Sequence, residues 1–276
     1  MKKEDCEMMI QPYLMRECED YHQVVINNYG ISHFYELTTG ENPYEDVKAV
    51  PDGCVDLLFL LDQDQVHTCI GGTVFQAKKW PLMKNTRYFG MRFEPGKCKL
   101  PKDISIEDII DDDLLIDGNA FGDFLQEEIA DQNSMEKRID IFLKQYCKKF
   151  AKDEKSFSLE DYIRMRIQRK KGNFSIRDLE EETGYSACYI RRVFKKVHGI
   201  SPKVFGEFVR FQNLIQRIEK NEKRMSMEEL AIECGYYDQP HMTRYFKKFA
   251  GTTPEAYLRE MEEKEYGGMK NEFIKD

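Results

Sequence analysis

The chain has 276 residues, of which 41% are hydrophobic and 33% charged, and its formal net charge is −8. This length and composition suit one large or two ordinary globular domains. No apolar run approaches the roughly eighteen residues of a transmembrane helix, and the charged start MKKEDCEMM differs from a secretory signal, so we expect a cytoplasmic protein with no membrane partner.

The charges are divided unevenly along the chain. Residues from Lys155 onward contain 24 Lys and Arg against 20 Asp and Glu, whereas the preceding residues contain 18 against 30. This asymmetry predicts different partners for the two parts. The eight cysteines are scattered without a C-x-x-C pair, which is typical of reduced thiols rather than of a zinc or redox centre.

The first hundred residues have the pattern of short strands. Alternating or short apolar runs, bounded by Gly, Pro and Asp, occupy residues 31–37, 55–61, 66–72 and 87–96. In the last run Phe89, Met91 and Phe93 share one face, while Tyr88 and Arg92 share the other. Several short strands of this kind predict a β-sandwich or small barrel.

After Pro101 the apolar spacing becomes helical and predicts an appended helical hairpin. One stripe comprises Phe121, Phe124, Leu125 and Ile129, and the other Met135, Ile139, Phe142, Tyr146 and Phe150. The second stripe either packs on its own domain or pairs with another copy in a homodimer.

These patterns predict an α+β protein of two domains. Residues 1–150 form the first domain, which is β-rich to about residue 100 and helical after it. The charged residues 151–156 are the predicted linker, residues 157–262 form an all-helical domain, and residues 263–276 are a tail. A long apolar stripe after Pro202 predicts a longer helix within the second domain.

The second domain contains a repeated phrase. GYSACYIRRVFKKVHGISP occupies residues 184–202, and GYYDQPHMTRYFKKFAGTTP occupies residues 235–254. Ile176, Leu179 and Gly184 recur 51 residues later, and after one inserted residue the offset of the R-x-F-K-K and G-x-[ST]-P motifs becomes 52. A match of this kind indicates a duplicated structural unit.

Each copy has the signals of a helix-turn-helix. Ser175 or Ser226 caps a short helix with acidic residues in its first turn, and Gly184 or Gly235 suits the left-handed turn that closes it. A second helix follows, on which the Arg and Phe of R-x-F point to different faces. Two such helices on one linker could enter successive major grooves; the alternative is a plain helical domain with a solvated lysine face.

At these residues the sequence resembles the AraC/XylS family of bacterial transcription regulators. The resemblance covers about Phe157 to Arg259 and includes ELAIECGYYDQPHMTRYFKKFAGTTPEAY in the second copy. It implies a seven-helix double helix-turn-helix domain that binds promoter DNA, with a central helix after Pro202. Family habit also implies activation through RNA polymerase.

The resemblance implies which side chains meet double-stranded DNA. They are Ala187, Cys188, Arg191 and Arg192 in the first unit, and Gln239, Pro240, His241, Thr243 and Arg244 in the second. Arginine and glutamine suit guanine and adenine edges, whereas Lys195 and Lys248, with Lys196 and Lys247, suit phosphates. Small Ala187 and Cys188 predict that the first unit reads fewer bases than is usual in the family.

The first domain resembles, through PDGCVDLLF, IGG and GMRFEPG, a sensor-like domain found before some AraC-type units. A cavity in such a domain would suit a small-molecule effector, with Asp56, Trp80 and Arg92 as candidate ligand contacts. In the alternative interpretation Asp52 caps its turn, Asp56 pairs with Arg92, and Trp80 only packs.

No pattern indicates an enzyme, a cofactor or a metal. His22, His33 and His67 lack metal-ligand spacing, and no phosphate-binding or nucleophile motif is present. We therefore expect a DNA-binding activator with an effector-sensing domain. The alternative is a regulator whose first domain only dimerises or binds another protein.

Overall fold

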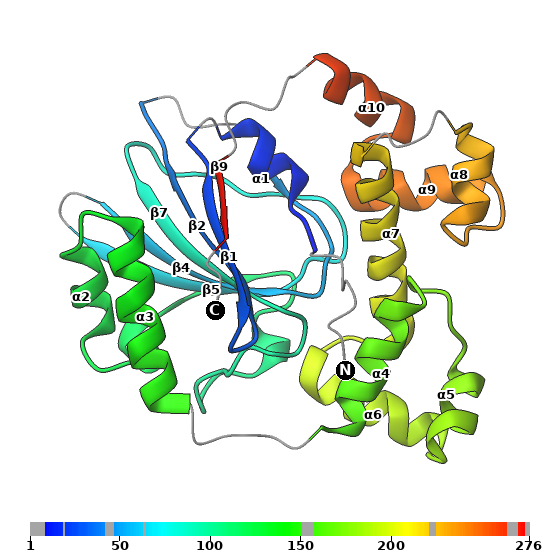
Figure 1. Cartoon of the computed structure of the whole chain (residues 1–276), viewed down its shortest axis with the longest axis horizontal. Coiled ribbons are helices and arrows are strands. Elements are labelled where there is room, and N and C mark those ends of the chain that lie inside the picture. Colours follow the sequence, from blue (N-terminus) through cyan, green and yellow to red (C-terminus); the bar gives the residue numbers. More distant parts are fainter. Residues whose placement is uncertain are drawn as a thin grey trace.

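The computed structural model describes residues 9–18, 20–41, 47–62, 65–150, 157–220, 225–263 and 270–273; the predicted linker 151–156 lies outside them. Figure 1 shows a β-sheet region built from the first half of the chain beside a helical region built from the second. The expected α+β class with two parts is confirmed. No helix among these residues combines the length and apolarity that crossing a membrane requires.

One long sheet dominates the first region. Its strands, in the order β8-β5-β4-β7-β2-β1-β9, are antiparallel except for the β1–β9 pair, which is parallel. The strands are β1 (His22–Asn28), β2 (Ile31–Thr38), β4 (Val55–Leu61), β5 (Val66–Gly71), β7 (Arg87–Phe93), β8 (Asp113–Ile116) and β9 (Lys270–Phe273); β3 (Lys48–Ala49) and β6 (Lys78–Lys79) form a separate ribbon.

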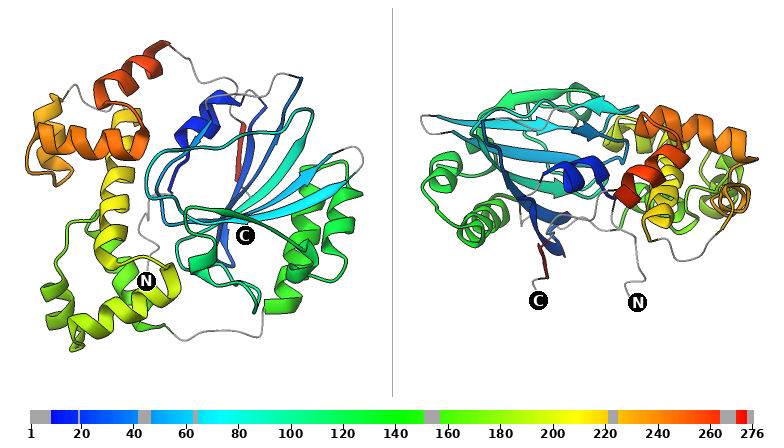
Figure 2. Two further views of the ribbon diagram at one scale, coloured as in Figure 1. Left: turned by 180° about the vertical axis from the view of Figure 1, so that it is seen from behind. Right: turned by 90° about the horizontal axis from the view of Figure 1, so that it is seen from above.

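The alternation along β7 is confirmed by the packing on its two faces. Phe89, Met91 and Phe93 are fully buried in the core that the sheet shares with the helical hairpin, whereas Tyr88 packs with Trp80 on the other face. Successive strand side chains point to opposite faces, so one strand supplies both cores. Among the described residues β8 and β9 are the edges of the long sheet, the helical hairpin covers one of its faces (Figure 2), and the β3–β6 ribbon is a second, short sheet. The β-rich first domain with an appended helical hairpin is thus confirmed.

The helical hairpin comprises α2 (Leu125–Ala130) and α3 (Met135–Phe150). On α3, Ile139, Phe142 and Tyr146 are buried against the sheet, which supports packing within the domain over pairing with a second copy. The first predicted stripe was wrong at Phe124. This residue is 73% exposed at φ 56°, because the chain turns there and the helix begins only at Leu125.

Shorter helical elements complete the first region. They are α1 (Pro12–Glu17) and two 3-10 turns, η1 (Ile106–Asp108) and η2 (Gly118–Phe121). The sequence patterns predicted neither α1 nor the strands β1, β8 and β9. β9 lies within the segment predicted as a tail.

Seven helices make up the second region among the described residues, as the family resemblance implied. They are α4 (Leu159–Arg169), α5 (Ile176–Thr183), α6 (Ala187–His198), α7 (Pro202–Lys220), α8 (Met227–Glu233), α9 (Gln239–Ala250) and α10 (Pro254–Glu263). The central helix α7 is buried along most of its length and carries Phe205, Phe211 and Ile215, all fully buried. Phe211 meets Phe246 of α9, and Phe205 meets Phe194 of α6, so α7 joins the two units through aromatic packing.

The two regions contact each other directly. A Cβ built on Gly53 would lie 2.8 Å from the Phe205 ring on α7, and one built on Gly96 would lie 2.7 Å from the His198 ring on α6. The Lys97 ammonium pairs with the Asp161 carboxylate of α4 at 2.5 Å. The sheet region therefore packs against three helices of the second region, α4, α6 and α7.

Candidate DNA-binding surface and cavity

In the first unit, short-range hydrogen bonds fix both helix starts. The Ser175 hydroxyl accepts from the Asp178 amide, and the Ser186 hydroxyl accepts from the Tyr189 amide. Gly184 closes α5 at φ 72° and Gly199 closes α6 at φ 68°, a left-handed conformation that glycine adopts without steric cost. The helix-turn-helix geometry of this unit therefore follows from local chemistry.

The second unit repeats the arrangement with different side chains. Ser226 and Glu229 form a reciprocal capping box at α8, and the Asp238 carboxylate accepts from the His241 amide at 2.7 Å to cap α9. Pro240 lies in the first turn of α9, where a missing amide hydrogen costs nothing. Gly251 ends α9 at φ 76°.

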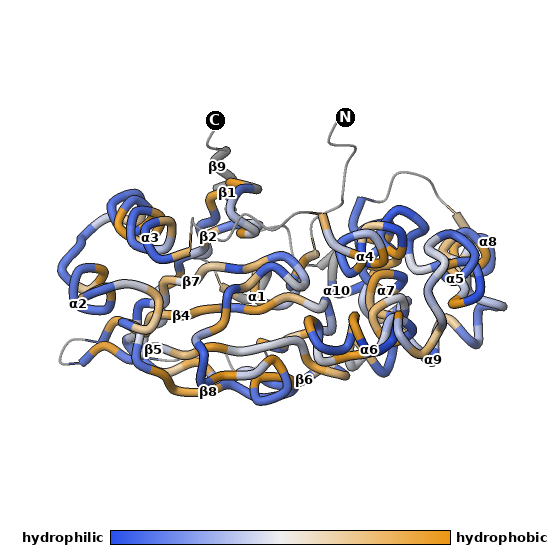
Figure 3. The backbone as a smooth tube through the Cα atoms, turned by 90° about the horizontal axis from the view of Figure 1, so that it is seen from below, coloured by the Kyte–Doolittle hydropathy of each residue, from blue (hydrophilic) through white to orange (hydrophobic). Residues whose placement is uncertain are grey.

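The second helix of each unit separates a core face from a solvent face. Phe194 on α6 and Phe246 on α9 are fully buried, while Arg191, Arg192 and Arg244 are exposed. Figure 3 shows α6 and α9 along the same side of the helical region, with α5 and α8 on the other. The predicted arginines are thus exposed on two helices that lie along the same side of the helical region.

The remaining predicted DNA contacts differ in how accessible they are. Cys188 and Pro240 are exposed, whereas Ala187, Gln239, His241 and Thr243 are half-buried. The Ala187 amide already donates to the Glu180 carboxylate at 2.6 Å, and the Gln239 amide nitrogen donates to the Glu255 carboxylate at 3.3 Å. The Gln239 side chain is therefore engaged in part by Glu255.

The predicted phosphate contacts lie near the first region. Lys195 pairs with Glu107 at 3.3 Å, with both side chains mostly exposed. Lys248 is exposed beside the Phe249 ring, and its carbonyl oxygen accepts from the Ala77 amide at 3.3 Å. These lysines stand at the C-terminal ends of α6 and α9, where they face the sheet region as well as solvent.

Sequence reasoning missed two tyrosines on the first unit. Tyr185 and Tyr189 are exposed, and their rings stack at a centroid distance of 5.0 Å. The Arg192 guanidinium lies 5.0 Å from the Tyr189 ring centroid, within cation–π range. The signal was available, because the 52-residue offset aligns Tyr189 with His241, which was predicted to contact DNA.

Residues 179–260 match the model of a helix-turn-helix domain, and residues 29–114 match a domain of unknown function, DUF6597. The probable transcription factor PqrA of Proteus vulgaris is 32% identical over 97 residues, which are 35% of this chain and 76% of PqrA. The chain belongs to the AraC/XylS family.

Two further comparisons place this AraC/XylS member beside other proteins. The multiple antibiotic resistance protein MarA of Escherichia coli strain K12 is 30% identical over 84 residues, or 30% of this chain and 64% of MarA. Among solved structures, apo ToxT K231A from Vibrio cholerae aligns with 84% of this chain and 98% of its own, at 13% identity and a TM-score of 0.44. As a member of this family, the chain is a DNA-binding transcription regulator.

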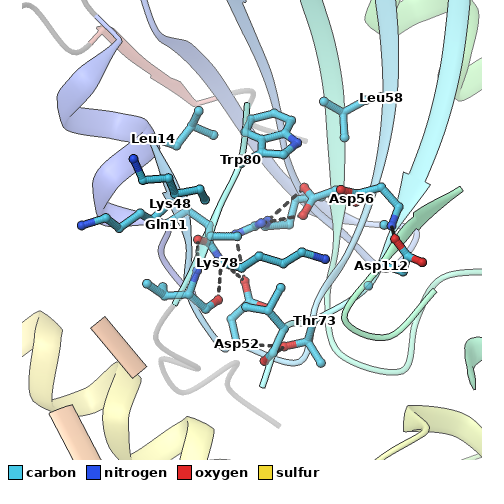
Figure 4. A pocket seen from close by; sticks show the side chains of 18 of the residues that line it. Gln11, Leu14, Lys48, Asp52, Asp56, Leu58, Thr73, Lys78, Trp80 and Asp112 are labelled. Carbon is cyan, nitrogen blue, oxygen red and sulfur yellow. Dashed lines mark hydrogen bonds and ion pairs between the residues drawn. The ribbon is translucent and has the colours of Figure 1, made fainter. Parts of the chain in front are cut away.

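The sheet region of this AraC/XylS regulator contains a cavity of about 280 Å³. It lies between α1, the β3–β6 ribbon, and the face of β2, β4 and β7 that is opposite the helical hairpin. In Figure 4 the apolar side chains of Leu14, Leu58 and Trp80 lie above the carboxylates of Asp52 and Asp56. The structure therefore brings together Asp56, Trp80 and Arg92, the three predicted ligand contacts, in one cavity wall.

A buried ion network forms part of that wall. The Arg92 guanidinium contacts Asp52 at 3.0 Å and Asp56 at 2.5 Å, and the Tyr35 hydroxyl donates to Asp56 at 3.2 Å. Burial raises the pKa of Asp52, an effect that the Arg92 charge partly offsets. Asp52 also accepts from the Cys54 amide at 2.8 Å and so caps its turn.

These contacts match the structural alternative raised for Asp52, Asp56 and Arg92. Two carboxylates already hold the Arg92 guanidinium, so an incoming anion would have to compete with both of them. Trp80 is half-buried and meets the Tyr88 ring edge-on at 5.9 Å, and its indole still lines the cavity. A ligand in the cavity would thus contact the Trp80 indole on one side and the paired charges of Arg92, Asp52 and Asp56 on another.

Proposed function

We propose that this protein is a one-component regulator in which α6 and α9 read a promoter and the cavity binds a small effector. The observation that carries the DNA-reading proposal is the pair of capped helices α6 and α9, which lie along one side of the helical region and carry exposed arginines. The buried helix α7 joins them, and its 19 residues span about 28 Å, close to one turn of B-DNA.

Within this proposal Arg191, Arg192 and Arg244 read base edges, because exposed guanidinium groups on these helices suit guanine. Tyr189 supports Arg192 and itself contacts the duplex. Ala187, Cys188, Gln239, Pro240, His241 and Thr243 complete the two contact surfaces. The lysines Lys195 and Lys248 meet phosphates, which orient the protein without specifying sequence.

The effector is a metabolite-sized molecule with both apolar and polar groups. The cavity supports this class, because its wall combines Trp80 and Leu58 with charged and amide side chains. We further propose that the regulator acts in the cytoplasm as an activator and contacts RNA polymerase, in keeping with family habit. An effector changes activity only if it binds two arrangements of the protein with different affinity.

The alternative function treats the sheet region as a dimerisation or protein-interaction module without a ligand. The α3 stripe does not favour it, because that stripe is buried within its own domain. A homodimer would therefore need another surface.

The decisive experiment selects duplexes from a random library with the full chain. The selected duplexes are then footprinted, and protein from its native host is examined by mass spectrometry for a co-purifying molecule. We expect two protected major-groove segments about one turn apart. Failure to enrich any sequence would refute promoter reading, whereas enrichment without a bound molecule would support the alternative function.

A further inference from the structure

The wall of the cavity lies directly against the helix that joins the two DNA-reading units. The turn at residues 50–53 lines the cavity through Val50 and Asp52. Its last residue, Gly53, packs on Phe205 of α7. A second segment, residues 71–74, also lines the cavity, and the ring of the next residue, Phe75, lies 6.5 Å from the Phe208 ring of α7, measured between centroids. Two segments that line the cavity therefore also pack against α7.

Two glutamine side chains, Gln212 and Gln11, form hydrogen bonds between α7 and the segments that line the cavity. On α7, the Gln212 amide nitrogen donates to the carbonyl oxygens of Ile10, at 3.1 Å, and Pro51, at 3.0 Å. Its carbonyl oxygen accepts from the Ile10 amide at 2.9 Å. We call this set, together with Gln11, the amide bridge.

Gln11 continues the amide bridge to the cavity side. Its amide nitrogen donates to the Val50 carbonyl oxygen at 2.8 Å and to the Asp52 carboxylate at 2.7 Å, while its own oxygen accepts from the Val50 amide at 2.8 Å. Asp52 in turn holds Arg92 in the cavity wall. Hydrogen bonds joined by the backbone of residues 10–11 and 50–52 thus connect α7 to the cavity, and Figure 4 shows the part around Gln11 and Asp52.

Burial makes this series resistant to exchange with water. Gln212 is 1% exposed, Asp52 2% and Gln11 8%. A buried polar group that loses its partner carries its full desolvation cost. When α7 shifts, the turn at residues 50–53 therefore moves with it rather than separating from it.

We propose that Gln212 couples the cavity to the DNA-reading units, so that DNA bound across α6 and α9 changes the cavity and a molecule in the cavity changes DNA binding. This inference rests on the proposed function, because it takes the two units as the DNA surface and the cavity as the effector site. Coupling between two sites is reciprocal in free energy. DNA alone can therefore reveal it, without knowledge of the effector.

Trp80 offers a direct readout. It is the single tryptophan of the chain and lines the cavity, so its fluorescence reports that site alone. The full chain is titrated with a duplex selected from a random library, and acrylamide quenching of Trp80 is measured alongside fluorescence anisotropy of the labelled duplex. We expect quenching to fall on DNA binding, because DNA held by both units restrains α7 and with it the cavity wall.

Variants test whether the amide bridge carries this effect. Gln212→Leu should bind the same duplex but lose the fall in Trp80 quenching, and Gln11→Leu should lose it from the other end. Asn213→Leu is the matched control, because this neighbouring buried amide faces Cys234 within the helical region. It should keep the wild-type response, and circular dichroism checks that each variant is folded.

The outcomes separate the two proposals. If the chain selects no duplex, the proposed function fails. If wild-type protein binds its duplex while Trp80 quenching stays constant or rises, the coupling is refuted and the proposed function stands. An equal fall in quenching in wild-type protein and both bridge variants also refutes the role of Gln212.

Discussion

The guanidinium of Arg192 lies over the ring of Tyr189, 5.0 Å from its centroid, on the exposed side of α6. Both residues belong to the same helix at a spacing of three, which places them on one face. The tyrosine ring therefore restricts a long, flexible arginine before any DNA is bound. This preorganisation lowers the entropy that Arg192 loses when it reads a base.

The first prediction concerns this pair. Tyr189→Ala should weaken binding to a selected duplex by about 0.5–1 kcal/mol, the usual size of an exposed cation–π contact. Tyr189→Phe keeps the ring and should bind nearly as well as wild-type protein. Fluorescence anisotropy with selected and scrambled duplexes measures both, and equal losses for the two variants would assign the effect to the hydroxyl group instead.

The second prediction separates base reading from phosphate contact on α9. Arg244→Ala should cost about 1–3 kcal/mol on the selected duplex and relax one base position, because its guanidinium stands on the exposed face. Lys248→Ala should weaken selected and random duplexes alike and reduce the salt dependence of binding. Equal losses of Arg244→Ala on both kinds of DNA would contradict a base-reading role.

The third prediction tests the packing between the sheet region and α7. Gly53→Ala forces a non-glycine residue to φ 81° and places a Cβ 2.8 Å from Phe205. Gly184→Ala is the control, since its φ of 72° is similar and open space surrounds it. Each variant should lose about 1–2 kcal/mol of unfolding free energy through the backbone, and Gly53→Ala about 1–3 kcal/mol more through the clash. Chemical denaturation with matched slopes measures the difference, and equal losses would mean that the Phe205 ring moves aside.

The fourth prediction concerns pH. Burial lowers the pKa of His33 to about 3, and the Arg92 charge adds to this effect; burial also lowers the pKa of His198. Between pH 6.5 and about 3 the unfolded chain therefore holds a proton on His33 that the folded chain lacks. The unfolding free energy should fall as pH falls through this window, by about 1.4 kcal/mol from His33 alone between pH 7.5 and 5.5.

A variant assigns this slope to its source. His33→Leu removes this imidazole, so denaturation at pH 7.5 and 5.5 should show a loss of unfolding free energy about 1.4 kcal/mol smaller than in wild-type protein. An unchanged pH slope in this variant would show that other groups control the acid sensitivity.

The helix-turn-helix units could be predicted because their determinants are local. Ser175, Gly184, Ser226 and Gly235 each act within four residues of their own position, and the duplication presents every signal twice. The alternation on β7 was equally visible, because burial on both faces depends on a period of two.

Asp56, Trp80 and Arg92 were predicted as cavity contacts, but the segments that surround them were not, because the cavity forms between segments that are distant in sequence. Arg92 meets Asp52 across 40 positions, and Gln11 meets Val50 across 39. Phe124 misled the helical pattern for a related reason: an apolar residue at helical spacing was taken as part of a stripe, whereas the turn before α2 directs it outward. Apolar spacing carries no information about where a chain reverses direction.

The strand β9 ties the far end of the described chain to the sheet. After α10 the chain returns to the first region and pairs in parallel with β1, from His22↔Lys270 to Val25↔Phe273. Along the chain, the helical region therefore lies between two segments of the sheet region, α3 before it and β9 after it. Shortening the chain before residue 270 would uncover the hydrogen-bonding edge of β1 and offer it to other chains, so such a deletion would damage solubility before it touched the surface that reads DNA.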